Sequence, residues 1–156
     1  MASTEPHHER RQLGLWTLDI RKDAPAGNIS IIELFAGNVQ GAIVDFSCLV
    51  YPGRKNPLIV TSVSAAGTDL PSHRARERVS VTLKVDDNPV RSYSAEYVAL
   101  GRVAFPPDQP PTETLKDMDS GHWLRVSQDG ADGLIEIGGY SQAFDVFFSA
   151  CSALRR

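Results

Sequence analysis

The sequence lacks the features that define several large classes of protein. No apolar run approaches the roughly 18 residues that a membrane-spanning helix needs. There is no basic excess either, because 16 lysines and arginines are set against 19 aspartates and glutamates, for a formal net charge of −3. Nucleic-acid-binding domains usually carry such an excess. We therefore expect neither a membrane span nor a nucleic-acid partner.

Patterns for metal ions and phosphate groups are also missing. The histidines include no His-x-x-x-His pair, there is no glycine-rich phosphate loop, and two cysteines alone do not make a zinc site. Asp86, Asp87 and Asn88 depart from the spacing of a calcium loop and predict a hairpin turn instead. We expect no metal ion and no cofactor.

What is present indicates one globular domain. The chain has 156 residues, of which 42% are hydrophobic and 22% charged, enough for a single core. Residues 1–12 are polar and predict a disordered or tag-like segment, and residues 13–156 predict a single β-rich domain. Truncation before Gly14 should then leave folding intact.

Short β-branched and alternating segments, separated by turn residues, predict eight or nine strands. They are not separated by helices, so the fold class is mainly β: an antiparallel sandwich or partly open barrel with a C-terminal helix. A short helix is expected from Thr112, as its cap, to Asp117. The expected strands are 16–20, 29–35, 42–50, 58–63, 79–85, 91–94, 96–105, 122–126 and 134–137.

The two cysteines lie on apolar faces in opposite halves of the chain. Cys48 shares a strand face with Val44 and Phe46, and Cys151 shares a helix face with Phe144 and Phe147. A disulfide between them would join the C-terminal helix to the β-core. The alternative is a pair of reduced core cysteines, since free cysteine is itself often buried.

A disulfide predicts an oxidising compartment. The polar residues 1–12 contain no apolar stretch of a signal peptide. Two interpretations follow: the protein is periplasmic or secreted and its leader has been removed, or it is cytoplasmic. The cysteine pattern favours the first.

Ser141 is the candidate catalytic residue. Gly139-Tyr140-Ser141-Gln142-Ala143 follows an apolar strand and opens a helix, as the nucleophile elbow of a hydrolase does. However, Ala143 replaces the second glycine, and no histidine follows Ser141 in the chain. The pattern favours a helix cap and no enzyme, with a small serine hydrolase as the alternative.

An arginine-rich loop is the candidate binding site. His73, Arg74, Arg76 and Arg78 form a small positive patch of a kind that binds phosphate or carboxylate groups. The proline-rich loop 106–111 is a second exposed segment. Exposed loops on a rigid scaffold often carry recognition, so we expect a protein partner and a monomer or weak oligomer.

Three features resemble a group of small secreted bacterial proteins. They are Gly14-Leu15-Trp16, the strand that ends near Cys48, and the terminal motif Phe144-Asp145-x-x-Phe148-x-x-Cys151. The layout is similar to the invasion-associated locus B family and to the type VI secretion accessory proteins TagO and VasI. That resemblance implies a periplasmic β-rich domain with no catalytic residues to carry over.

The sequence therefore predicts a non-enzymatic periplasmic or secreted accessory or binding protein. Besides the hydrolase, an inhibitor or immunity protein that acts through a surface loop is a further alternative.

Overall fold

The computed structural model describes residues 7–22, 30–49, 56–66 and 70–153. All of its described strands form one antiparallel sheet in the order β1-β2-β3-β4-β5-β8-β7-β6-β9-β10. The predicted mainly β, antiparallel class is confirmed, and the sheet is not closed into a barrel. The strands are β1 (His7–Leu13), β2 (Trp16–Lys22), β3 (Ser30–Gly37), β4 (Ile43–Leu49), β5 (Leu58–Ser64), β6 (Arg78–Val85), β7 (Arg91–Ala99), β8 (Arg102–Ala104), β9 (Trp123–Gln128) and β10 (Ala131–Glu136).

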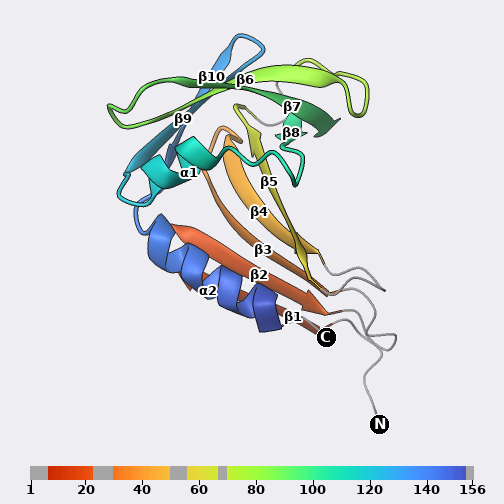
Figure 1. Cartoon of the computed structure of the whole chain (residues 1–156), viewed down its shortest axis with the longest axis vertical. Coiled ribbons are helices and arrows are strands. Elements are labelled where there is room, and N and C mark those ends of the chain that lie inside the picture. Colours follow the sequence, from red (N-terminus) through yellow and green to blue (C-terminus); the bar gives the residue numbers. More distant parts are fainter. Residues whose placement is uncertain (1–6, 23–29, 50–55, 67–69, 154–156) are drawn as a thin grey trace.

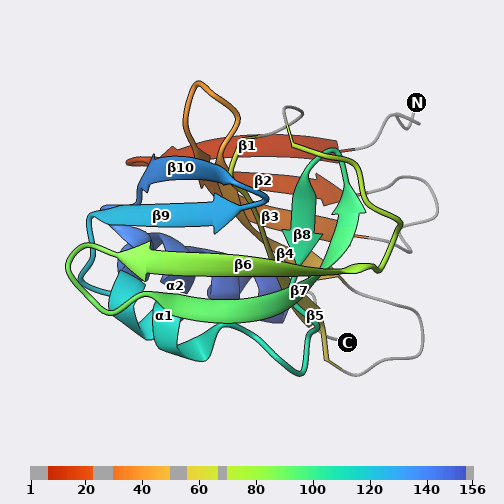
Figure 2. The ribbon, with the colours of Figure 1, turned by 90° about the horizontal axis from the view of Figure 1, so that it is seen from above.

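The sheet curves so that its two halves share one core. β1–β5 form a long layer, and β6–β10 lie across its upper end (Figure 1). Seen from above, β9 runs between β6 and β10 (Figure 2). The helix α2 (Tyr140–Ala153) packs on β2 and β3, while α1 (Thr112–Met118) packs on β6.

The strand alternation separates an inner face from an outer face. On β2 to β4 the inner residues are fully buried, among them Trp16, Leu34 and Phe46. The Phe46 ring lies 5.7 Å from the Tyr140 ring and 6.3 Å from the Phe147 ring, both on α2. The indole Nε1 of Trp16 donates to the carbonyl of Ile137 at 3.2 Å, which satisfies the one polar atom of that side chain.

The predicted Cys48–Cys151 disulfide is present, with the two Cα atoms 5.9 Å apart. Both cysteines are buried on the inner side, where α2 covers β4. The bridge joins positions 103 residues apart, so it links the end of the chain to the middle of the first layer.

Four expectations about element boundaries are wrong. His7–Gln12, expected to be disordered or tag-like, belong to β1, which pairs with β2 along its whole length. The expected strands 91–94 and 96–105 are divided differently, because β7 runs without a break through Ala99 and a turn at Leu100 and Gly101 separates it from β8. α1 has Pro111 at its cap position without a side-chain cap bond, so Thr112 does not cap it. The turn before β10 is only two residues long, Asp129 and Gly130, and both have positive φ angles.

Candidate functional site

The arginine loop lies between β5 and β6 and is anchored to β7. The backbone N–H of Arg76 donates to the carbonyl of Tyr97 at 2.9 Å, and the N–H of Tyr97 donates to the carbonyl of Glu77 at 2.9 Å. Arg76 has a φ of 68°, the left-handed conformation that a tight turn requires. The loop therefore has a fixed path at this point.

His73 is not free to bind a ligand, because both of its ring nitrogens are already used. Nδ1 donates to Glu77 at 2.6 Å and Nε2 donates to Asp129 at 2.9 Å. Only the protonated imidazolium can donate from both nitrogens. The hydrogen bond to Glu77, followed by the one to Asp129, raises the pKa of His73. His73 therefore joins the arginine loop to the β9–β10 turn.

The three arginines of the loop remain exposed. Arg78 donates to the carbonyl of Ser94 at 3.4 Å. Within the described residues the arginines that form ion pairs are Arg10, Arg21 and Arg91, so Arg74 and Arg76 are not among them. The anchored loop 72–78 thus presents guanidinium groups on a fixed backbone, and we call it the arginine platform.

The proline loop is also ordered locally. The N–H of Gln109 donates to the carbonyl of Pro106 at 2.8 Å, and the N–H of Leu115 donates to that of Pro111 at 3.0 Å, where α1 begins. Residues 107–110 are exposed, whereas Pro111 is buried. This loop offers backbone and proline rings but no charge other than Asp108.

Ser141 lies at the second position of α2, which begins at Tyr140, so it is not the cap that the sequence predicted. Its side chain is exposed. Gly139, with a φ of 81°, makes the sharp turn from β10 into the helix. In the described part of the chain, no hydrogen bond joins Ser141 to a histidine or a carboxylate.

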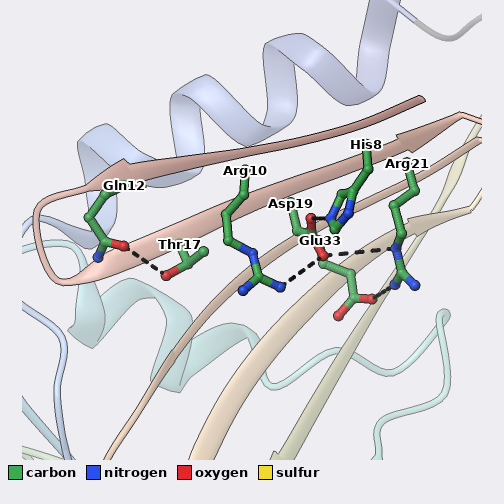
Figure 3. Close-up of polar contacts among 7 residues, drawn as sticks. All are labelled: His8, Arg10, Gln12, Thr17, Asp19, Arg21 and Glu33. Atoms are coloured by element: carbon green, nitrogen blue, oxygen red, sulfur yellow. Dashed lines mark hydrogen bonds and ion pairs between the residues drawn. The ribbon is translucent and has the colours of Figure 1, made fainter. Parts of the chain in front are cut away.

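Sequence reasoning missed a network of charged side chains on the outer face of β1–β3 (Figure 3). Asp19 is buried there and is contacted by His8, by Arg10 at 3.6 Å and by Arg21 at 3.8 Å. Arg21 also donates to Glu33 at 2.6 Å. Residues 8–12 are all polar, so no alternation of polar and apolar side chains marks them as a strand in the sequence.

Asp45 extends this network to β4. Its side chain is 1% exposed, and within the described residues its Oδ2 meets no hydrogen-bond donor. Burial, followed by a hydrogen bond with Glu33 and repulsion from its charge, raises the pKa of Asp45 to about 7; Ser47 and Arg102 act in the opposite direction. A protonated Asp45 carries no charge, so it does not repel the carboxylate of Glu33.

An open pocket of about 710 Å³ lies at the end of the sheet where three turns meet. We call it the turn pocket. Its walls are mainly apolar, and Arg102 is the one charged residue among the described residues that line it. They are Leu15, Thr17, Phe35, Ala36, Gly37, Asn38, Gly41, Ala42, Ile43, Ser64, Val98, Ala99, Leu100 and Arg102.

The turn pocket has a rigid frame. Asn38 accepts hydrogen bonds from the N–H groups of Gln40 and Ala42 at 2.9 and 3.0 Å, and its own amide donates to Leu134 at 3.0 Å. The buried Gln128 donates to the carbonyl of Gly101 at 3.0 Å, which holds the β7–β8 turn. A cavity whose wall is fixed in this way can be complementary to a ligand before binding.

Asp86, considered above as a possible calcium ligand, has a structural role. Asp86 accepts hydrogen bonds from the N–H groups of His122 and Trp123, both at 3.0 Å, in the hairpin turn that the sequence predicted. Across the described ranges, no group of three or more His, Cys, Asp or Glu residues is arranged to hold a metal ion. No helix in those ranges is long and apolar enough to cross a membrane.

No family model, no curated protein and no solved structure matches this chain. The resemblance to the invasion-associated locus B family and to TagO and VasI therefore stays a prediction, carried by Trp16, Cys48 and Cys151 as structural positions.

Proposed function

We propose that the protein is a non-enzymatic binding or accessory protein that works outside the cytoplasm, in the periplasm or after secretion. In this proposal it acts as a monomer or weak oligomer and binds a protein partner through the arginine platform. The observation that carries it is the double hydrogen bonding of His73, which fixes the platform while leaving Arg74 and Arg76 exposed.

The disulfide supports the location. Protein disulfides form and persist in oxidising compartments and are rare in the cytosol. Cys48 in β4 and Cys151 in α2 are both buried where the helix meets the strand, so folding brings them together in the core rather than on a surface where chance oxidation occurs.

The charge arrangement supports the kind of partner. The chain as a whole is acidic, at −3, while the platform concentrates arginines on one anchored loop. Guanidinium groups bind carboxylates in a bidentate geometry, and a fixed backbone lowers the entropy lost on binding. We therefore expect an acidic protein surface as the partner.

Affinity capture from an extract of the native host tests the partner. The baits are the wild type, Arg74→Gln/Arg76→Gln, and Arg125→Gln as a matched control, because Arg125 is an exposed arginine on another strand. We expect a protein that wild type and Arg125→Gln retain, that the double variant loses, and that high salt releases. If no captured protein depends on Arg74 and Arg76, the platform is not the binding site.

Thiol alkylation of freshly isolated, denatured native protein tests the location. We expect no free thiol, since both cysteines are in the bridge. Two alkylated cysteines would contradict an oxidising compartment.

A further inference from the structure

The turn pocket is separate from the arginine platform and is not explained by it. It is bounded by the β1–β2 turn, the β3–β4 turn and the β7–β8 turn. A volume of about 710 Å³ falls in the range of pockets that hold small organic ligands. The pocket thus has the size of a ligand site.

The pocket walls favour an apolar ligand body. Phe35 and Ile43 stand on the outer face of β3 and β4, and Val98 and Leu100 form the rim, where they are 52% and 73% exposed. Leu15, on the opposite rim, is 47% exposed. Exposed apolar side chains gathered around a hollow are typical of a binding site, whereas scattered ones need no explanation.

Arg102 gives the pocket a single positive charge. It is half-buried in β8, lines the pocket, and is not among the arginines that form ion pairs within the described residues. A guanidinium in a partly desolvated wall binds an anionic group more strongly than one in water does.

Asp45, whose carboxyl group interacts electrostatically with Arg102, competes only weakly with a ligand for the guanidinium. In the sheet register Asp45 lies between Phe35 and Ser62, and Arg102 is on the neighbouring β8. Glu33 on β3 lies diagonally across from Asp45, opposite Ser47, and burial together with repulsion from Glu33 raises the pKa of Asp45 to about 7. A neutral Asp45 leaves the charge of Arg102 available to a ligand.

We propose that the turn pocket binds a small amphipathic anion, whose apolar body lies against Phe35 and Ile43 and whose anionic group is bound by the guanidinium of Arg102. The site is independent of the platform, so either proposal can fail without the other.

A pair of fluorescent probes tests the proposal on the whole protein. Anilinonaphthalene sulfonate is an apolar ring system with one negative charge, and phenylnaphthylamine has the same rings without the charge. We expect wild type to bind the sulfonate at least about tenfold more tightly than the neutral probe at about pH 6, because hydrogen bonds to charged groups contribute that much. Equal affinity would mean a purely apolar surface and would overturn the proposal.

Variants locate the binding. Arg102→Gln should abolish the preference for the sulfonate, and Arg102→Lys, which keeps the charge, should restore most of it. Val98→Glu, at the exposed rim, should weaken sulfonate binding by repulsion. Arg125→Gln and Val90→Glu are the matched controls, since both residues are exposed and lie outside the pocket.

Thermal melting of each variant accompanies the titrations, because partly unfolded proteins also bind such probes. A sulfonate preference that persists in a folded Arg102→Gln, or is lost equally in Arg125→Gln, contradicts the assignment to Arg102. Displacement of the bound sulfonate by decanoate but not by decanol would extend the site to carboxylates; displacement by both alike would contradict the role of charge.

Discussion

At the scale of single residues, the surroundings favour the neutral form of one ionisable side chain and the charged form of another. Asp45 is buried beside another carboxyl group and keeps a proton, whereas His73 lies between two carboxylates and is held in its charged form. The same rule explains both: burial disfavours charge, and an oppositely charged hydrogen-bond partner favours it.

Asp45→Asn should stabilise the protein at neutral and alkaline pH. The pKa of Asp45 is raised from 3.8 to about 7, so between these values the folded state holds a proton that the unfolded state has lost. Stability therefore falls as pH rises through that window, and asparagine removes the effect. We expect a gain of roughly 2–4 kcal/mol in the free energy of unfolding at about pH 8, and little change at about pH 4.

Urea denaturation at the two pH values measures this difference. Asp87→Asn serves as the control, since Asp87 is exposed. An equal effect of Asp45→Asn at both pH values would show that the pKa of Asp45 is the same in the folded and unfolded states, which contradicts its raised value.

His73→Asn should destabilise the protein in a pH-dependent way. The raised pKa of His73 means that its contribution is fully present below 6.5, the unfolded-state value, and is lost as pH rises through the higher folded-state value. Melting curves of wild type and His73→Asn should therefore differ most in mildly acidic solution and converge at alkaline pH.

At the scale of elements, close approaches decide which residues the strands can carry. β10 passes close to the chain beside two strand ends: a Cβ on Gly133 would lie 2.6 Å from the Cβ of Ala42, which precedes β4, and 2.2 Å from the carbonyl oxygen of Ala65, which follows β5. A backbone carbonyl cannot move aside as the end of a flexible side chain can. This contact brings the two layers of the sheet together beside the turn pocket.

Gly133→Ala should therefore destabilise the protein by about 1–3 kcal/mol or more, the usual result of overpacking. Gly138→Ala is the control, because its nearest neighbour would be the Leu15 Cδ1 atom at 3.7 Å, an ordinary contact. Calorimetric melting distinguishes the two. Equal melting temperatures would mean that β10 can separate from β4 without loss.

At the scale of the whole molecule, the disulfide connects β4 of the sheet to the C-terminal helix α2, which no backbone pairing of the sheet does. Neither cysteine is near the other in sequence, and α2 is the last described element. Closing a loop of this length reduces the conformational entropy of the unfolded chain. The loop-entropy model puts the resulting stabilisation of the folded state at about 4–5 kcal/mol.

Cys48→Ala/Cys151→Ala should consequently lower the melting temperature by roughly 10 °C or more. Reductant should lower the melting temperature of wild type similarly and should leave the double variant unchanged. A wild type insensitive to reductant would indicate that the bridge does not contribute to stability.

The sequence alone predicted the β-rich class, most of the strands and the cysteine pairing. The strands follow from the local alternation of polar and apolar residues, and the cysteine pairing from the apolar face that each cysteine shares with its neighbours. Each of these patterns is visible within a few residues of the sequence. Cys48 and Cys151 were predictable because each lies in a strongly apolar pattern.

Only the tertiary structure decided the rest. β1 is a polar strand whose place depends on its pairing with β2, so no hydrophobic pattern marks it. The Asp45–Glu33 pair and the turn pocket join residues from separate strands and turns. The sequence groups His73 with the neighbouring arginines, and its hydrogen bond to Asp129, 56 residues away, is decided by the fold. The physical reason is the same in each case: a pKa or a cavity is set by neighbours in space, which a local sequence pattern does not specify.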